Sequence, residues 1–258
     1  MIPHSPAASS DSPSSSAAVT LIVPVFNEEE NLEALAQEIY AAMSEQPRTW
    51  ELLFVDDAST DNSLGVLQSL AAASPWTDYL SFRENRGQSA ALAAGFAHAR
   101  GEIFVTLDAD LQNDPADIPP MLNLYDQGYD MVAGWRARRQ DNLVKRLCSR
   151  IANTIRNRLS RESVKDTGCS LKVMRAAMCR QLPVFRGMHR FLPTLMKMRD
   201  GTVAEMRVNH RPRKSGISKY GVWDRAFSGL YDLLAVRWMQ DRLIRYQIKE
   251  QGKPPPTE

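Results

Sequence analysis

The 258-residue sequence has only three cysteines, Cys148, Cys169 and Cys179, and no CxxC spacing. A sparse, odd-numbered set of cysteines argues against a disulfide framework and indicates a reducing compartment. The N-terminus lacks the basic and apolar segments of a signal peptide, and no run of about 18 apolar residues is present that could span a bilayer. These absences predict a cytoplasmic location without a membrane-spanning segment.

The charge of the whole chain is also small, +2 at neutral pH, and by itself indicates no particular partner. Residues 1–134 contain 20 Asp and Glu against 4 Lys and Arg, whereas residues 135–258 contain 10 against 28. Two interpretations fit this asymmetry. Either the two oppositely charged parts attract each other, or the basic part meets a polyanion such as phosphates, nucleic acid or an acidic membrane.

Residues 1–17 contain seven serines and three prolines and almost no apolar residues. Such a segment buries too little apolar surface to offset the entropy of ordering, so we predict a disordered tail. The length and the 43% hydrophobic content fit one α/β domain with an appendage. We place that domain at residues 18–222, and an amphipathic C-terminal helix with a tail at residues 223–258.

From Val19 onward, apolar runs with β propensity alternate with segments of helical periodicity. This alternation predicts a mostly parallel sheet with right-handed crossovers, in which ligands bind beyond the carboxyl ends of the strands. The expected strands are 19–25, 51–55, 79–82, 103–107 and 130–134, and the expected helices are 31–43, 63–73 and 88–99.

Beyond residue 134 the chain becomes basic and the regular alternation ends. The expected elements are a helix over about 141–159, a turn at 168–170, a helix near 175–181, a strand over 203–210, a basic loop over 211–219 and an amphipathic helix or helix pair over about 223–249.

Three of the expected strands end in polar clusters: Asn27-Glu28, Asp56-Asp57 and Asp108-Ala-Asp110. Because parallel strands end at one edge of a sheet, we expect these clusters to converge on a site. Two carboxylates at positions i and i+2 can approach one hard divalent cation, which can bridge the phosphates of a nucleotide diphosphate. Gln112 supplies a further oxygen. A solvated loop is the alternative interpretation of the same spacing.

Several short motifs follow one another along the chain. They begin at residues 22 (IVPVFNE), 55 (VDDASTD), 85 (NRGQSA), 108 (DADLQNDP), 134 (GWR), 150 (RIAN), 166 (DTG), 188 (MHRFLP) and 214 (KSGISKY). With these motifs in this order, the chain resembles family 2 glycosyltransferases, most closely the polyprenyl-phosphate group that includes dolichol-phosphate mannosyltransferase and undecaprenyl-phosphate glycosyltransferases. The resemblance runs from about residue 19 to residue 235.

The resemblance implies a glycosyltransferase A-type, Rossmann-like α/β domain with a mostly parallel central sheet and a C-terminal helical extension. It also implies transfer of a hexose such as mannose from a GDP- or UDP-linked donor to a polyprenyl phosphate, with inversion and with Mg or Mn as cofactor. Transfer to a soluble or glycan acceptor is the alternative. We expect no nucleic acid partner, because the basic residues lack interleaved aromatic side chains. The sequence is compatible with a homo-oligomer.

Site residues on the donor side follow from the resemblance, position by position. It implies nucleoside contacts for Pro24, Phe26 and Glu28, base recognition for Val55 and Asp57, metal and diphosphate contacts for Asp108, Ala109, Asp110 and Gln112, phosphate or sugar contact for Arg136, and a basic pair closing over the diphosphate for Arg213 and Lys219. The metal ligands would be Asp108, Asp110 and Gln112. The alternatives are structural: a strand terminator at Pro24, a helix N-terminal charge at Glu28, turn residues at Asp57 and a solvated run at 213–219.

On the acceptor side, Lys145, Arg146, Ser149 and Arg150 are spaced to share one helix face, and similar positions in the family are thought to meet the lipid phosphate. A solvated basic face is the alternative. His189 and Arg190 are further candidates, although a lone histidine is commonly structural. A lipid phosphate is already anionic near neutral pH, so no strong general base is expected.

The C-terminal segment departs from the family, because many bacterial relatives continue into two transmembrane helices where this chain has residues 238–258. Apolar residues with interspersed Arg and Lys, among them Trp223, Phe227, Leu230, Leu234 and Trp238, predict an interfacial helix on the inner face of the membrane. Packing on the catalytic domain or on a dimer partner is the alternative.

Overall fold

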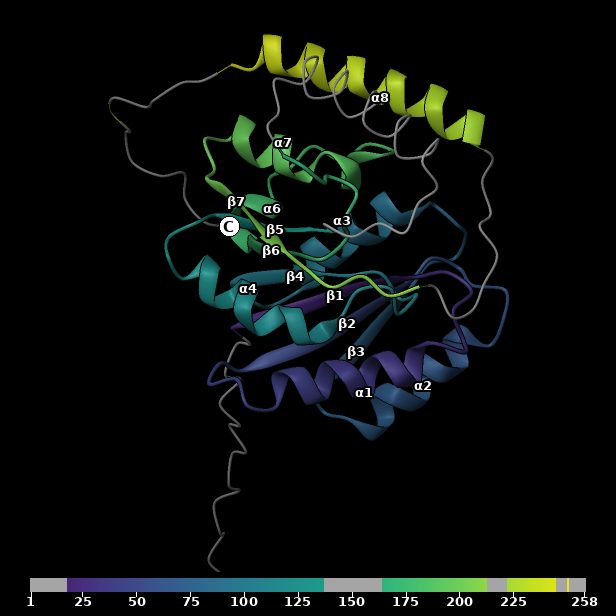
Figure 1. Cartoon of the computed structure of the whole chain (residues 1–258). Coiled ribbons are helices and arrows are strands. Elements are labelled where there is room, and N and C mark those ends of the chain that lie inside the picture. Colours follow the sequence, from purple (N-terminus) through teal and green to yellow (C-terminus); the bar gives the residue numbers. More distant parts are fainter. Residues whose placement is uncertain (1–17, 137–163, 213–221, 245–249, 251–258) are drawn as a thin grey trace, which may run out of the picture.

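The computed structural model describes residues 18–136, 164–212, 222–244 and 250. In this part of the chain, one sheet lies between layers of helices (Figure 1). Its strands are β1 (Val19–Val25), β2 (Trp50–Asp56), β3 (Thr77–Ser81), β4 (Ile103–Thr106), β5 (Met131–Trp135), β6 (Lys172–Arg175) and β7 (Val203–Arg207). The helices are α1 (Leu32–Met43), α2 (Ser63–Ala73), α3 (Gln88–His98), α4 (Ile118–Tyr125), α6 (Ala176–Cys179), α7 (Leu192–Met198) and α8 (Val222–Arg242), with short 3₁₀ turns η1 (Pro115–Asp117) and η2 (Met188–Arg190).

The seven strands are ordered β3-β2-β1-β4-β6-β5-β7. β1, β2, β3 and β4 form parallel pairs, and β5 is parallel to β7, whereas β6 is antiparallel to both β4 and β5. The sheet is therefore mostly parallel, as the sequence predicts. β6 is not predicted, because it has only four residues and begins with a lysine. It places Lys172 opposite Thr106 at the carboxyl end of β4.

Alternate residues of each strand pack on opposite faces of the sheet. In β1, Leu21 and Val23 face the cluster with α1, α2 and α4, whereas Ile22 faces the cluster with α3, α6 and α7. Strands buried on both sides read as continuous apolar runs, which is why β1 and β2 could be identified from such runs. Each such side chain, fully removed from water, contributes about 1.5 to 3 kcal/mol.

Most predicted elements lie within a few residues of their observed bounds, but two helices were missed. α4 begins with Ile118-Pro119-Pro120 and α7 with Leu192-Pro193. Proline is tolerated in the first turn of a helix, where its missing N–H has no intrahelical partner. The prolines therefore mark the beginnings of these two helices. The strand expected at 203–210 ends at Arg207, although His210 forms an isolated bridge with Asn113.

α8 lies outside α7, at the far end of the molecule from α1 and α2 (Figure 1). Leu233 and Val236 on its inner face are buried in the core cluster with α3 and α7. Tyr231, Leu234 and Trp238 occupy the opposite face and are 77%, 53% and 64% exposed. α8 thus packs on the domain and also presents an apolar outer stripe. No helix in the described ranges has the length and apolarity needed to cross a membrane.

Candidate active site

The acidic loop that follows β4 lies at the carboxyl edge of the sheet, as predicted. Its chain turns sharply at Leu111, whose φ is +59°. The backbone N–H of Gln112 donates to Asp110 Oδ1 at 3.1 Å, and Gln88 Nε2 from α3 donates to Asp108 Oδ1 at 2.7 Å. These contacts fix one oxygen of each carboxylate.

The electrostatics of this loop fit a divalent cation. Burial raises the pKa of Asp108, and the nearby charge of Asp110 raises it further, while Ser170, Lys172 and Arg136 oppose the rise. Two carboxylates in such surroundings repel each other, and a hard cation bound by oxygen ligands would relieve that repulsion. Within the described ranges no three His, Cys, Asp or Glu side chains converge on one point. Among the described residues, Asp108, Asp110 and the amide of Gln112 are the groups on this loop that could hold a cation.

A cavity of about 940 Å³ opens beside the acidic loop. Its walls come from the first turn of α3, the loop leading into β6, the segment around η2 and one residue of α8. The lining residues are Pro24, Asn85, Arg86, Gly87, Gln88, Ser89, Leu92, Thr106, Leu107, Asp108, Asp110, Gln112, Thr167, Gly168, Ser170, Lys172, Arg186, Gly187, His189, Arg190, Leu192 and Asp232. The cavity thus brings together six of the predicted site residues: Pro24, Asp108, Asp110, Gln112, His189 and Arg190.

Six other predicted residues are described but do not line this cavity: Phe26, Glu28, Val55, Asp57, Ala109 and Arg136. Val55 and Ala109 are buried in the two core clusters. Phe26 is half-buried after β1, and Glu28 Oε2 accepts a 2.7 Å hydrogen bond from Asn31 Nδ2. The predicted residues Lys145, Arg146, Ser149, Arg150, Arg213 and Lys219 lie outside the described residues.

Asp57 holds the loop that leads into α3. Its Oδ1 accepts from the backbone N–H of Arg86 at 2.6 Å, and its Oδ2 accepts from that of Gly87 at 2.7 Å. Burial raises the pKa of Asp57, and the two backbone donors oppose this rise. Both oxygens are thus engaged by the protein. In this structure Asp57 positions residues 85–87, which line the cavity, and does not itself reach it.

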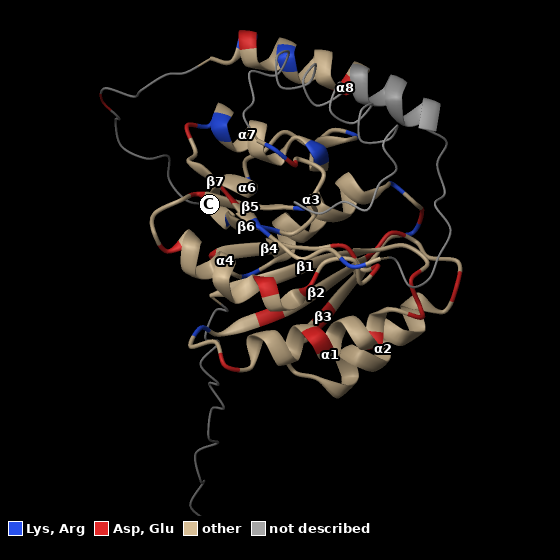
Figure 2. Cartoon of the chain, viewed as in Figure 1, with Lys and Arg blue, Asp and Glu red and all other residues tan. Residues whose placement is uncertain are grey.

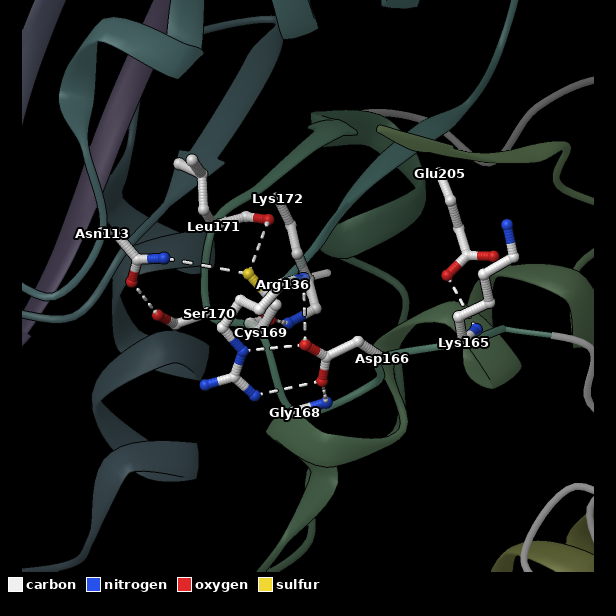
Figure 3. Close-up of polar contacts among 10 residues, drawn as sticks. All are labelled: Asn113, Arg136, Lys165, Asp166, Gly168, Cys169, Ser170, Leu171, Lys172 and Glu205. Atoms are coloured by element: carbon white, nitrogen blue, oxygen red, sulfur yellow. Dashed lines mark hydrogen bonds and ion pairs between the residues drawn. The ribbon is translucent and has the colours of Figure 1, made fainter. Parts of the chain in front are cut away.

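Arg136, at the end of β5, is bound side-on by Asp166 (Figure 3). Its Nε donates to Asp166 Oδ2 at 2.7 Å and its Nη2 to Oδ1 at 3.0 Å, and both side chains are largely buried. The backbone N–H of Gly168 also donates to Asp166 Oδ1, at 3.2 Å. A Cβ on Gly168 would lie 3.2 Å from Arg136 Nη2, so the absence of a side chain there lets the loop pass over the guanidinium.

Lys172 is the most deeply buried cation that lines the cavity, at 2% exposed. Its Nζ donates to the carbonyl oxygen of Cys169 (Figure 3). Burial lowers the pKa of Lys172, and the charges of Asp108 and Asp166 oppose that effect. The positive charge of the Lys172 ammonium offsets part of the negative charge of Asp108.

Sequence reasoning missed most of this wall. The sixteen lining residues without a predicted role are Asn85, Arg86, Gly87, Gln88, Ser89, Leu92, Thr106, Leu107, Thr167, Gly168, Ser170, Lys172, Arg186, Gly187, Leu192 and Asp232. Two of them had a usable signal. Lys172 interrupts the apolar run Leu171 to Met174, and Asp232 interrupts an apolar helix face, and a charge at a position that should be buried is commonly functional.

The charge asymmetry of the sequence has a spatial counterpart. Acidic residues mark α1 and the loops beside it, while basic residues mark α7 (Figure 2). The cavity lies between these regions and has both signs: Asp108 and Asp110 on one wall, Arg186 and Arg190 on another. This arrangement suits a ligand with several anionic groups, one of which is paired with a cation.

Comparisons with known proteins define the class. The family model Glycosyl transferase family 2 matches residues 20–182. The chain is 38% identical over 249 residues to a dodecaprenyl-phosphate galacturonate synthase of Rhizobium johnstonii, covering 95% of this chain and 72% of the relative. It is 35% identical over 218 residues to an undecaprenyl-phosphate 4-deoxy-4-formamido-L-arabinose transferase of Edwardsiella ictaluri, covering 84% of this chain and 66% of the relative.

Solved structures agree on the fold. A glucosyl-3-phosphoglycerate synthase from Mycobacterium tuberculosis, in complex with Mn²⁺, UDP and glucosyl-3-phosphoglycerate, superposes with a TM-score of 0.67 at 17% identity and covers 89% of this chain and 81% of its own. A mannosyltransferase from Pyrobaculum calidifontis, in complex with GDP-mannose and Mn²⁺, gives a TM-score of 0.60 at 22% identity, covering 94% and 67%. The fold is thus that of a glycosyltransferase A-type enzyme.

The chain belongs to glycosyltransferase family 2. It is a glycosyltransferase. The two relatives described above are polyprenyl-phosphate sugar transferases, the group that the sequence motifs resemble. The expectation of mannose as the sugar finds no support in these relatives, whose names specify galacturonate and 4-deoxy-4-formamido-L-arabinose.

Proposed function

We propose that this protein transfers a sugar from a nucleotide diphosphate donor to a polyprenyl phosphate, with Mg²⁺ or Mn²⁺ as cofactor. The observation that supports this most is the composition of one cavity: a carboxylate pair on one wall and Arg186 and Arg190 on the other. The acidic wall suits a cation-bound diphosphate, and the basic wall suits a second phosphate, that of the acceptor. The relatives named for dodecaprenyl and undecaprenyl phosphate support the same acceptor.

In this proposal Asp108 and Asp110 hold the cation, with the amide of Gln112 beside them. When bound, the cation offsets negative charge on the departing nucleotide. Gln88 and the backbone N–H of Gln112 keep the two carboxylates oriented. Arg136, held by Asp166 beneath the loop 167–168, contributes positive charge behind the phosphates rather than a direct contact.

The acceptor needs alignment more than proton removal, because a phosphate monoester is already anionic near neutral pH. Arg190 and Arg186 line the wall at which that phosphate would bind. Attack from the side opposite the leaving diphosphate inverts the anomeric carbon. For the sugar, we propose a uronate or a 4-formamido pentose rather than mannose, following the names of the relatives.

A donor screen tests this function. The full chain would be incubated with undecaprenyl or dolichyl phosphate, Mg²⁺ or Mn²⁺ and a panel of UDP- and GDP-sugars, and released nucleotide and organic-phase product would be measured. We expect product in the organic phase with at least one donor, and none with Asp110→Asn. Glu45→Gln, an exposed change far from the cavity, is the matched control. Nucleotide release without an organic-phase product would contradict the lipid acceptor.

One observation favours a second candidate, transfer to a hydroxyl of a soluble or glycan acceptor. Such an acceptor needs a base, and Asp232 of α8 supplies a carboxylate in the cavity. Burial raises the pKa of Asp232, with Arg190 opposing, as suits a base. A labelled product that stays in the aqueous phase, and that Asp232→Asn abolishes, would favour this candidate.

We further propose that the outer face of α8 contacts the membrane that contains the acceptor. The exposed stripe of Tyr231, Leu234 and Trp238 lies opposite the residues that pack on the domain, and α8 also supplies Asp232 to the cavity. Flotation with anionic liposomes would compare the wild type with Leu234→Ser/Trp238→Ser. We expect the double variant to lose flotation and Tyr40→Ser, an equally exposed change on α1, to keep it. Equal flotation of all three proteins would count against the contact.

A further inference from the structure

His189 lies on the basic wall of the cavity, and a hydrogen bond connects its ring to Ser89 of α3. Its Nδ1 lies 2.8 Å from Ser89 Oγ, and the backbone N–H of Gly187 donates to the same oxygen at 3.0 Å. Ser89 is 6% exposed. The three residues thus form one partly buried chain of hydrogen bonds between α3 and η2.

The direction of these hydrogen bonds follows from donor counting. A serine hydroxyl has one proton to donate, and Oγ of Ser89 already accepts from Gly187. Within the described residues, His189 Nδ1 is the acceptor that Ser89 Oγ can reach. A buried hydroxyl proton is stable only when bonded, so Ser89 donates to Nδ1. The ring proton of a neutral His189 is then on Nε2.

The surroundings keep this ring neutral. Burial, together with the positive charges of Arg190 and Lys172, lowers the pKa of His189 to about 3. Arg186 also lines this wall, and Asp232 from α8 is the one described carboxylate beside it, where it faces Arg190. An imidazolium would add another positive charge to a wall already rich in cations. A neutral ring that donates a hydrogen bond avoids this cost.

The segment has little freedom to rearrange. Gly187 has φ +90°, and a Cβ at this position would clash with Asp232 Oδ2. Its N–H is therefore held toward Ser89 by the backbone and by α8 together. Among the residues that the structure describes, Nε2 of His189 has no hydrogen-bond partner, although the residue lines the cavity. An N–H directed at no protein group, on a basic wall, suits an anionic oxygen of the substrate.

We propose that Ser89 holds His189 as the Nε2–H tautomer, so that His189 donates a hydrogen bond from Nε2 to a phosphate oxygen of the substrate. In this role His189 binds and orients the phosphate and never takes a proton. Ser89 is a positioning residue that acts through the ring. The inference rests on the proposed function for the presence of a phosphate here, and it deepens that function by assigning one donor. The phosphate belongs either to the lipid acceptor or to the nucleotide.

The first test reads the tautomer and needs no catalysis. The chain has four histidines, so ¹⁵N-histidine labelling gives a spectrum that His189→Gln can assign. We expect Nε2 protonated and Nδ1 unprotonated, with no titration between about pH 5.5 and 8, and a mixture of tautomers in Ser89→Ala. A ring protonated at Nδ1, or one that titrates in this range, would overturn the proposal even if the enzyme proves active.

The same spectra identify the phosphate. Farnesyl phosphate alone would shift the Nε2 resonance if the acceptor binds there, whereas UDP with Mg²⁺ alone would shift it if the donor does. If neither probe shifts the Nε2 resonance, in protein whose spectrum is otherwise native, the proposal is overturned. Because these measurements involve no sugar transfer, a failure of the proposed enzymatic function would be seen separately, as an absence of product.

Kinetics supply the second test. The amide nitrogen of glutamine can reach the position of Nε2, and that of asparagine the position of Nδ1. We expect His189→Gln to stay within about 3-fold of wild type, and His189→Asn to lose about 10-fold to 100-fold in kcat/KM, the usual effect of losing a hydrogen bond to a charged group. The pH profile should keep its shape in His189→Gln. Equal loss in both variants, or loss of a limb of the pH profile, would instead identify a base.

Discussion

Gln88 and Ser89 are neighbours in the first turn of α3, yet they hold opposite walls of the cavity. Gln88 Nε2 donates to Asp108 Oδ1 at 2.7 Å, and Ser89 Oγ lies 2.8 Å from His189 Nδ1. The two walls are 81 residues apart in sequence between Asp108 and His189. A single helical turn therefore sets the distance between the acidic loop and the basic wall.

Replacing Gln88 by methionine removes the side-chain donor to Asp108 while keeping a similar length. A hydrogen bond to a charged group contributes about 1.5 to 3 kcal/mol, so we expect kcat/KM to fall by about 10-fold or more with the fold retained. Steady-state kinetics and circular dichroism would be compared with Gln68→Met, an exposed change on α2. Unchanged kinetics in Gln88→Met would show that the acidic loop keeps its geometry without this contact.

Asp166→Asn would weaken the side-on hold of Arg136, because an amide cannot accept from both Nε and Nη2. We expect KM for the nucleotide sugar to rise by about 10-fold, since the guanidinium would lose its fixed place behind the cavity. Asp78→Asn, which changes an exposed carboxylate on β3, should be neutral. If Asp166→Asn keeps the wild-type KM, Arg136 does not contribute to binding of the nucleotide sugar.

Glu51 gives a pH-dependent contribution to stability. It is 7% exposed and accepts from Thr20 Oγ1 at 2.6 Å and from Arg100 Nε at 2.7 Å. Burial opposes ionisation, but these hydrogen bonds outweigh it and hold the pKa of Glu51 below the ordinary value of 4.5. A lowered folded-state pKa stabilises the protein above the unfolded-state pKa, and the contribution is lost as pH falls through the folded-state value.

Glu51→Gln should therefore lower the free energy of unfolding by about 1 to 3 kcal/mol near neutral pH. The difference from wild type should shrink below about pH 4, where wild-type Glu51 also becomes protonated. Urea unfolding at several pH values measures this, with Glu45→Gln as the exposed control. A difference that stays constant down to pH 3 would show that shape, not charge, explains the loss.

Gly95 lets α3 approach β1 closely, since a Cβ at this position would clash with Ile22 Cγ2. Gly95→Val should destabilise the domain by about 1 to 3 kcal/mol through overpacking. Ala97→Val, at an exposed position of the same helix, is the matched control. Ile22→Ala added to Gly95→Val should recover part of the loss. If the double variant is instead no more stable than the sum of both changes, the two side chains do not compete for space.

The fold and the acidic loop of the cavity could be predicted from the sequence because they follow from local patterns. Strands buried on both faces, such as β1, read as apolar runs, and the acidic loop stands where β4 must end. Most of the remaining lining could not be predicted, because it depends on which strand pairs with which. β6 is short and antiparallel, and only its pairing with β4 brings Lys172 to the acidic loop.

The observed contacts add detail that the sequence could not supply. A resemblance identified Asp57 and Arg136 as ligand-binding positions, but it could not show that Asp57 caps two backbone N–H groups or that Asp166 embraces Arg136. Local spacing contains no information on contacts that cross 30 residues. Asp232 was missed for the same reason, since only the packing of α8 places it beside Gly187.

The match to the family model ends at residue 182, whereas His189, Arg190 and Asp232 come after it. The acidic loop thus lies within the matched region, and a later segment adds the opposing wall. Substitutions at a few positions in 186–192 and on α8 would therefore alter the proposed acceptor side. The wall proposed to bind the nucleotide would be unchanged by them.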